Sequence, residues 1–456
     1  MAETSRGAGD RMPGGAAAAE IRRLLQDLDE TRVGEEMRAL ITELFPICRS
    51  ITGAGLRQSL RIVGRVVPLA VTEVPSGTAV FDWVVPREWN IRGAWVKGPS
   101  GEIVIDFQRS NLHVLNYSSP FRGRLGLEEL KPHLHSLPER PSLVPYRTSY
   151  YKESWGFCVS HDQLEALEPG EYEVLVDSSL EDGSLTYAEH LVQGATEDEI
   201  LVSCHCCHPS LCNDNLSGVA LTATLARVVG ALRPRYSYRF LFLPGTIGSI
   251  TWLARNEAQA LRIRHGLVVA CVGDRGPMTY KRSRRGDAEI DHAVEHVLGH
   301  SGQRFSVRDF SPYGYDERQY CSPGFDLAVG SLTRTPHGEY PEYHTSGDDL
   351  SFVENAALVE SLRRYLEVFE VLEGNGTYLN LSPKCEPQLG KRGLYDALGG
   401  RSHAMETQMA MLWVLNLSDG RHTLLAIAEK AKLPFHAVRE AAVALEAKNL
   451  LRREPG

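Results

Sequence analysis

Residues 199–232, EILVSCHCCHPSLCNDNLSGVALTATLARVVGAL, hold the pattern that decides the fold. They begin with a short apolar run typical of a buried strand, pass through a polar loop, and continue into an apolar helical stretch. The same alternation recurs in 236–245 (YSYRFLFLPG), 265–274 (HGLVVACVGD) and 325–333 (FDLAVGSLT), with helical segments between them. Strands that alternate with helices are typical of a mostly parallel sheet that helices cover on both faces. We therefore predict an α/β fold for the centre of the chain.

Segments on either side of this centre have other patterns and divide the chain into further units. Residues 1–19 are rich in Gly, Ala and small polar residues, which predicts a disordered leader. Short β-type runs separated by Pro, Gly and Ser predict a small β-rich inserted domain over 67–135. The α/β domain then takes 20–66 and 136–375. The helix-turn-helix spacing near the end of the chain predicts a winged-helix module over 376–456.

The composition indicates a globular protein and argues against several classes of function. The 456 residues carry a formal net charge of -9 and include 23% charged residues, so there is no basic surface of the kind that binds nucleic acid. No run of about 18 apolar residues could span a membrane, and the N-terminus lacks the apolar core of a signal peptide. Nine cysteines without paired spacing favour free thiols in a reducing compartment. We predict a soluble, cytoplasmic protein.

Polar side chains follow several of the predicted strands. His208 and Asp214 follow the first strand, Asp274 ends the third, and His344 lies beyond the fourth. Open α/β sheets bind ligands outside the carboxyl ends of their strands, so these residues should meet at one edge. Zinc accepts imidazole and carboxylate ligands, and a catalytic zinc site commonly keeps a fourth position for water. The four residues therefore predict a metal site at this edge of the sheet.

Four cysteines in the same stretch offer an alternative site, a thiolate cluster of Cys204, Cys206, Cys207 and Cys212. Structural zinc sites usually use separated C-x2-4-C pairs. Cys206 and Cys207 are adjacent, and neighbouring residues of an extended strand face opposite sides, so both cannot point at one ion. We expect these cysteines to be small buried apolar residues, the common role of a free cysteine. His205 lies inside the strand-like run and is predicted to be a packed histidine.

Several motifs of this chain resemble those of one known family. The runs SYYKESWGFC, GSLTYAE, CHPSLCNDNLSG, CVGD, DERQYCSPGFDL and YPEYHTSGDDL are similar to those of the aminopeptidase-like DUF4910 proteins with an inserted DUF2172 domain, which are related to the M28 zinc aminopeptidases. The resemblance covers about 34–372, and the C-terminal module is similar to the winged-helix domain that members commonly carry. It implies that His208 and Asp274 hold one metal, His344 holds a second, and Asp214 bridges them. The implied cofactor is Zn2+, one ion with a site for a second.

One position departs from the family pattern. Members of the family read PETIGS after the second strand, where M28-like enzymes carry a metal-binding carboxylate and a general base, but this chain reads PGTIGS with Gly245. Loss of a positioned base typically costs on the order of 100- to 10,000-fold in rate. Glu317 and Glu342 are the predicted substitutes as catalytic carboxylates, and Arg318 is the predicted clamp for a substrate carboxylate. The competing interpretation of all three is an ordinary solvated or ion-paired surface group.

The sequence leaves three hypotheses on function. The first is a zinc-dependent aminopeptidase-like hydrolase that cleaves a small amide or peptide with metal-activated water. The second is a catalytically degenerate member that binds a metal or ligand, because Gly245 replaces the expected Glu. The third, a transcription regulator, is disfavoured because 434–451 mixes acidic with basic residues and offers few phosphate contacts. Docking, or homo-oligomerisation through the C-terminal module, fits that segment better.

Overall fold

An eight-stranded sheet forms the centre of the molecule in a computed structural model, which describes residues 16–394 and 401–454. The four inner strands run parallel to one another, and antiparallel strands flank them on both sides. In spatial order the strands are β1 (Ala70–Pro75), β10 (Ser184–Val192), β12 (Ser237–Leu243), β11 (Glu199–His205), β13 (Ile263–Val269), β16 (Val329–Thr333), β14 (Met278–Lys281) and β15 (Phe305–Arg308). The predicted mostly parallel α/β sheet is confirmed.

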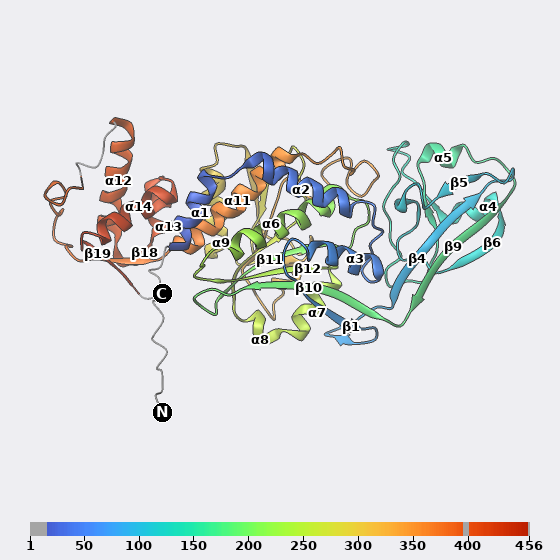
Figure 1. The fold of residues 1–456 in the computed structure, drawn as a ribbon, viewed down its shortest axis with the longest axis horizontal. Helices are drawn as coiled ribbons and strands as arrows, with labels where there is room; N and C mark the ends of the chain where they lie inside the picture. Colours follow the sequence, from blue (N-terminus) through green and yellow to red (C-terminus); the bar gives the residue numbers. More distant parts are fainter. Residues whose placement is uncertain (1–15, 395–400, 455–456) are drawn as a thin grey trace, which may run out of the picture.

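Helices cover both faces of this sheet (Figure 1). All seven residues of β12 are buried, and they alternate between two core clusters: Tyr238, Phe240 and Phe242 belong to one, Leu241 and Leu243 to the other. Burial on both faces explains why the inner strands are continuous apolar runs in the sequence. One face carries α1 (Ala16–Gln26), α2 (Glu30–Leu44), α3 (Ala54–Val63), α6 (Gly218–Gly230), α9 (Glu289–Gly299) and α11 (Asn355–Gly374); the other carries α7 (Ile247–Arg255), α8 (Glu257–Ala260) and α10 (Glu317–Tyr320).

A second, antiparallel sheet lies at one end of the molecule (Figure 1). Its strands, in spatial order, are β5 (Ile103–Asp106), β4 (Glu88–Lys97), β9 (Glu171–Glu181) and β6 (Phe121–Gly126). Three of the four come from the predicted insert at 67–135, and β9 joins them from a later part of the chain. Next to this sheet lie α4 (Leu127–Leu130), β7 (Leu134–His135), β8 (Phe157–Cys158) and α5 (His161–Glu165), whereas the hairpin of β2 (Ala79–Val80) and β3 (Trp83–Val84) contacts α7 of the central unit.

The C-terminal residues form the predicted winged-helix module at the opposite end (Figure 1). The module contains α12 (Arg401–Leu417), α13 (Leu424–Ala431), α14 (Phe435–Glu446) and a sheet of β18 (Asp419–Thr423), β17 (Thr377–Asn380) and β19 (Leu451–Arg453). Phe435 is 4% exposed and belongs to the same core cluster as Ile21 of α1 and Phe369 of α11. The module and the central unit therefore share one continuous apolar core.

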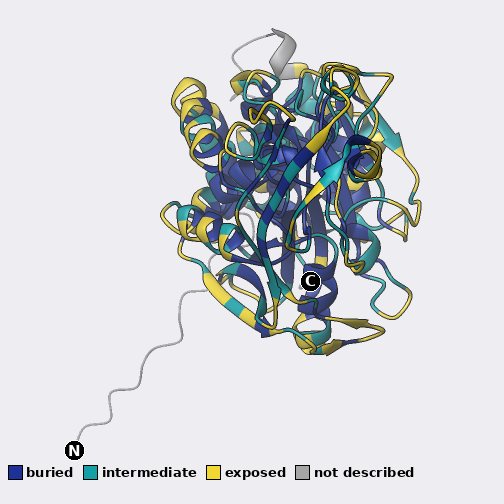
Figure 2. Ribbon diagram, turned by 90° about the vertical axis from the view of Figure 1, so that its right-hand side faces the viewer, coloured by how far each residue is buried: buried dark blue, intermediate teal, exposed yellow. Residues whose placement is uncertain are grey.

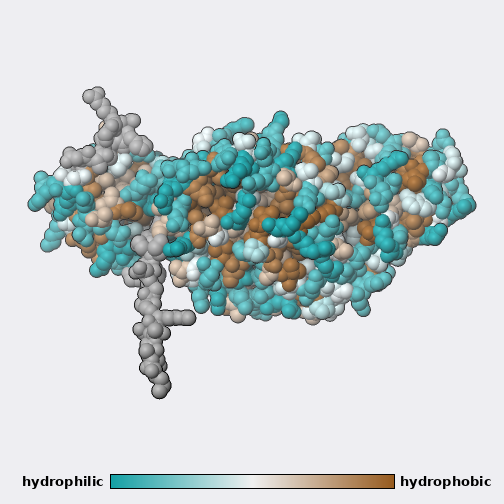
Figure 3. Space-filling view, viewed as in Figure 1, coloured by the Kyte–Doolittle hydropathy of each residue, from teal (hydrophilic) through white to brown (hydrophobic). Residues whose placement is uncertain are grey.

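Burial and hydropathy follow this arrangement. Buried residues concentrate in the middle of the central unit, and exposed ones lie at its periphery (Figure 2). Hydrophilic residues dominate the face shown in Figure 3, with hydrophobic groups mainly over the central unit. Within the described ranges, no helix is both apolar enough and long enough to cross a lipid bilayer. Of the predicted leader, 16–19 belong to α1, and the rest lies outside the described residues.

Candidate metal centre

The carboxyl end of β11 carries the first side chain of the candidate site. His205 is the last residue of this strand and is 1% exposed. The chain then leads into a π-helical turn, η3 (Cys212–Ser217), which contains Asp214 with non-helical φ and ψ of -111° and 82°. The side chain of Asp348 fixes this turn, because its two oxygens accept hydrogen bonds from the backbone N–H groups of Asn213 (2.5 Å) and Asp214 (2.9 Å). Asp214 is thereby held at the sheet edge beside His205.

Three imidazoles surround the carboxylate of Asp214. His205 Nε2 lies 2.8 Å from Asp214 Oδ1, and His344 Nε2 lies 3.1 Å from Asp214 Oδ2. His208 Nδ1 is 3.8 Å from Oδ1. One ligand atom each of His205, His208 and Asp214 lie within 4.8 Å of one another, a spacing at which all three could bind a single ion. We name His205, His208, Asp214 and His344 the histidine–aspartate cluster.

Burial and charge set the protonation of this cluster. Burial alone would raise the pKa of Asp214, but the neighbouring imidazoles of His208, His205 and His344 outweigh it and hold the pKa well below its usual value. Burial also lowers the pKa of His208 well below its usual value, despite the attraction of Asp214. His208 Nδ1 is buried and has no hydrogen-bond partner. An ionised carboxylate beside a neutral imidazole with a free ring nitrogen is the state in which these groups bind metals.

Aromatic rings line the cluster. Tyr315 stacks on His205 with ring centroids 4.8 Å apart, and its hydroxyl donates to Asp214 Oδ1 over 3.3 Å. Tyr343 stacks on His344 with centroids 4.0 Å apart. Tyr146 presents its ring at right angles to His344, at 5.1 Å, and its backbone N–H donates to the His344 carbonyl. These rings restrict the positions that the imidazoles can adopt and shield Asp214 from solvent.

A buried arginine supports the loop that carries His208. Arg49 is 1% exposed, and its Nε donates to the backbone carbonyl of His208 over 3.0 Å. Its Nη1 donates to the carbonyl of Leu44, whereas its Nη2 is buried without a partner. Burial lowers the pKa of Arg49 to about 10. The segment that follows α2 is thus tied directly to the candidate site.

The structure places Asp274 beside the cluster in a different set of contacts. Its Oδ1 accepts from Thr335 Oγ1 (2.6 Å) and from the N–H of Gly276 (2.7 Å), and its Oδ2 accepts from Asn213 Nδ2 (3.0 Å). Asp274 is 3% exposed, and its carboxylate does not belong to the group of His205, His208 and Asp214. In this structure it orders the loop next to Asp214.

The three predicted catalytic side chains lie outside the histidine–aspartate cluster. Glu317 is buried, and its Oε1 accepts a hydrogen bond from Lys281 Nζ over 2.8 Å, while its Oε2 has no partner. Arg318 is half-buried, with its Nε buried and unpartnered. Glu342 is half-buried, two residues before His344. Glu317 is therefore a buried, ion-paired group.

Gly245 lies two residues beyond the end of β12, next to the cluster. A Cβ at this position would lie 3.1 Å from His205 Cβ and 3.4 Å from Asp316 Oδ2. Asp316 is fully buried; its Oδ1 accepts from Ser249 Oγ over 2.7 Å, and its Oδ2 has no partner. Burial raises the pKa of Asp316 to about 6, although His205 and Ser249 oppose the shift. The carboxylate nearest to the position of the missing Glu is thus Asp316.

The cysteines of the same stretch behave as packed residues. Cys204, Cys206, Cys207 and Cys212 are buried, at most 6% exposed, and all of them are free thiols. Burial raises the pKa of each thiol; that of Cys207, for example, rises to about 12. Protonated thiols are poor metal ligands, so these contacts agree with the predicted role as small buried apolar residues.

Two residues that lie beside the predicted ligands were not among them, His205 and Asp316. His205 ends a strand at the edge where His208 and Asp214 were expected, so its position in the strand was a usable signal. Asp316 directly precedes Glu317 in the DERQY motif, and nothing in the sequence indicates that its side chain turns toward Gly245.

Comparison with known proteins places this geometry in context. Residues 38–375 match the family described as a domain of unknown function (DUF4910), and 376–453 match a winged helix-turn-helix family. A protein of Clostridium acetobutylicum, provisionally named as a polysaccharide biosynthesis protein with an aminopeptidase-like domain, is 53% identical over 433 residues, which cover 95% of this chain and 99% of the relative.

Solved structures extend the comparison to more distant proteins. The crystal structure of a protein from Clostridium acetobutylicum, provisionally described as a peptidase, is 51% identical, has a TM-score of 0.91, and covers 96% of this chain and 100% of that chain. A zinc aminopeptidase from Bacillus subtilis is 13% identical, with a TM-score of 0.54, and covers 74% of this chain and 94% of that chain. The similarity to the Bacillus subtilis enzyme shows that the two proteins share the aminopeptidase-like fold. The chain therefore belongs to the DUF4910 family, with an aminopeptidase-like domain followed by a winged helix-turn-helix.

Proposed function

We propose that the protein is a zinc-dependent hydrolase of a small amide or peptide, with the histidine–aspartate cluster as its metal site. The observation that carries this proposal is the fully buried carboxylate of Asp214, which has ligand atoms of His205 and His208 within 4.8 Å. A buried carboxylate among histidines costs free energy unless a cation or a hydrogen-bond network balances it. The cluster is therefore better suited to holding an ion than to packing a core.

The donor set fits zinc. Two imidazoles and one carboxylate within 4.8 Å offer the nitrogen and oxygen ligands that zinc prefers, and the free Nδ1 of His208 has no other partner. His205, His208 and Asp214 would hold one ion, and His344 with Asp214 would contribute to a second. Zinc at this site would polarise a substrate carbonyl and lower the pKa of a nearby water molecule.

The residues of the chain have separate tasks in this proposal. Asp348 positions Asp214 through the two backbone N–H groups described above, as outer partners of metal ligands commonly do. Tyr315 and Tyr343 exclude water from the imidazoles on which they stack. Asp316 offers the unpartnered Oδ2 as a proton acceptor in the corner that Gly245 leaves without a carboxylate.

A second candidate function rests on Gly245. Asp316 is fully buried, so it is less accessible to a substrate than the Glu of the family pattern would be. A protein with this corner altered could bind a metal and a small ligand without rapid hydrolysis. In either case we propose that it acts in the cytoplasm, where free thiols stay reduced, and that the winged-helix module serves docking or homo-oligomerisation.

The test combines metal analysis with hydrolysis. Protein purified without chelator should contain at least one zinc per chain and should cleave members of a panel of aminoacyl amides and dipeptides. His205→Ala should lose both the metal and the activity, whereas Cys206→Ser, a buried change in the same stretch, should keep both. Equal zinc content in the two variants would refute the site. Zinc binding without hydrolysis would favour the second candidate.

A further inference from the structure

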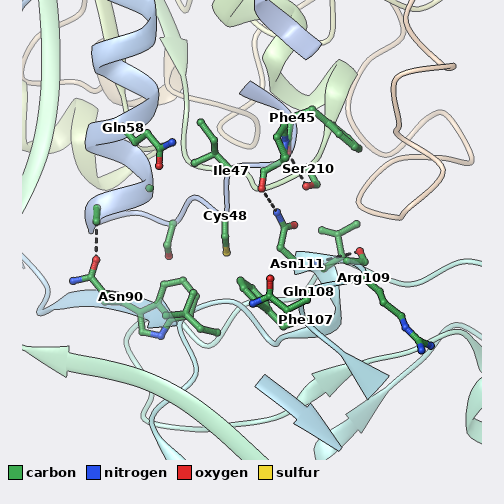
Figure 4. Close-up of a pocket in the computed structure, with 18 of the residues that line it drawn as sticks. Phe45, Ile47, Cys48, Gln58, Asn90, Phe107, Gln108, Arg109, Asn111 and Ser210 are labelled. Atoms are coloured by element: carbon green, nitrogen blue, oxygen red, sulfur yellow. Dashed lines mark hydrogen bonds between the residues drawn. The ribbon is translucent and has the colours of Figure 1, made fainter. Parts of the chain in front are cut away.

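A cavity of about 640 Å³ lies between the central unit and the four-stranded sheet (Figure 4). Residues 45–52, which follow α2, and residues 54–58 in the first part of α3 form one wall. Residues 89–91 of β4 and residues 107–112, which follow β5, form the opposite wall. This volume lies within the range of about 300 to 1,000 Å³ that is typical of small-molecule sites. The cavity is separate from the histidine–aspartate cluster, since none of the four cluster residues lines it.

The polar groups of the cavity are almost all neutral. Among the described residues that line it, Arg109 is the only one with a charged side chain. Four side-chain amides line the walls, those of Gln58, Asn90, Gln108 and Asn111, together with several serine and threonine hydroxyls. Such groups donate and accept hydrogen bonds but do not compensate charge. The lining therefore favours an uncharged ligand that is rich in hydrogen-bonding groups.

Several of these amides have hydrogen-bonding capacity to spare. Asn111 Nδ2 donates to the carbonyl of Pro46 over 3.3 Å, but its Oδ1 is buried without a partner. Within the described ranges, the side-chain amides of Gln58 and Gln108 make no hydrogen bond, although both residues line the cavity. The Oδ1 atom of Asn111 has no accessible surface, so a ligand in the cavity would not contact it. The exposed side-chain amides of Gln58 and Gln108 are the groups that a ligand hydroxyl would bind.

Apolar surface lies beside these amides. Phe107 is half-buried and lines the cavity, as does the largely buried ring of Trp89. A ring face next to amides and hydroxyls suits a ligand that has both C–H faces and hydroxyl edges. We propose that this cavity binds a neutral polyhydroxylated small molecule, a mono- or disaccharide.

The cavity is also in contact with the loops of the candidate metal centre. Ser210 and Ser346 line it, two residues after His208 and His344 respectively. Ser210 Oγ donates to the carbonyl of Phe45, which lines the same cavity, over 2.8 Å. A bound sugar would therefore touch the loops that carry two histidines of the cluster, without occupying the cluster itself.

The experiment is calorimetric titration of the full-length, chelator-treated protein with glucose, galactose, N-acetylglucosamine and sucrose at millimolar concentrations. At least one of these sugars should bind saturably at one site per chain. Gln58→Ala and Gln108→Ala should each weaken binding roughly tenfold, the loss expected when one hydrogen bond to the ligand is removed. Because the protein is metal-free in this test, the result does not depend on whether the proposed hydrolase activity exists.

A matched control keeps the outcome specific. Gln303 is exposed like Gln58, lies far from the cavity in sequence, and its side chain makes no hydrogen bond within the described residues. Gln303→Ala should therefore leave sugar binding unchanged. Gln58 and Gln108 are both exposed, so neither substitution should affect folding. No saturable heat from any of the four sugars, or equal affinity in Gln58→Ala and the native protein, would overturn the proposal.

Discussion

Gly245→Glu tests the corner of the candidate site where the family resemblance predicts a glutamate. A Cβ at this position would lie 3.4 Å from Asp316 Oδ2 and 3.1 Å from His205 Cβ, so an introduced carboxylate would lie roughly 5 Å from that of Asp316. Two like charges about 5 Å apart at an effective dielectric constant near 20 repel each other by about 3 kcal/mol. We expect Gly245→Glu to lose about this much stability at pH 8, where Asp316, with its pKa of about 6, is ionised.

A double-mutant cycle isolates this repulsion. Urea denaturation at pH 8 with chelator would compare the native protein, Gly245→Glu, Asp316→Asn and the double variant. The double variant should recover about 3 kcal/mol relative to the sum of the single changes, because the repelling charge is gone. A coupling energy below about 0.5 kcal/mol, the usual limit of additivity, would show that the two carboxylates do not face each other. In a separate measurement without chelator, added zinc should stabilise Gly245→Glu more than the native protein, since the introduced carboxylate is a potential ligand.

Three further changes test other parts of the structure. Asp348→Asn should weaken zinc affinity about 10- to 100-fold in a competition assay with a chelator, because it loosens the turn that holds Asp214; unchanged affinity would remove the positioning role. Burial raises the pKa of Glu370 from 4.5 to about 7, so the stability from this group is present below pH 4.5 and is lost as the pH rises through 7. Glu370→Gln should therefore exceed the native protein in stability by about 3 kcal/mol at pH 8 and by much less near pH 5, measured by denaturation at both pH values; the opposite order would contradict it. Phe435→Ala should destabilise the protein by about 3 to 5 kcal/mol, because this ring is 4% exposed in the core that the module shares with the central unit. A loss below 1 kcal/mol in the same assay would show that the shared core contributes little.

The central sheet was predictable because its signal is local. Each inner strand is a continuous apolar run next to a helical segment, and burial on both faces produces that pattern within about ten residues. The pairing of β9 with β4 was not predictable in the same way. It joins residues 171–181 to 88–97, and no local periodicity identifies the partner of an antiparallel strand.

The candidate site was predictable in part for a related reason. The rule that strand ends meet at one edge correctly gathers His208, Asp214 and His344, since the rule depends only on the order of the strands. The direction of a side chain at a strand end depends on tertiary contacts. Asp274 turns toward Thr335, 61 residues later, whereas His205 turns toward Asp214. The sequence alone does not indicate which of these two side chains points toward Asp214.

The hydrogen bond from Arg49 to the carbonyl of His208 joins residues 159 positions apart, and Asp214 meets His344 only 130 residues further along the chain. Ribosomes add about 5 to 20 residues per second, so roughly 7 to 26 s separate the synthesis of this aspartate from that of its distant imidazole partner. Until His344 has been synthesised, the histidine–aspartate cluster lacks one of its three imidazoles. The complete cluster, and any ion bound by all its members, can therefore be assembled only after most of the chain has left the ribosome.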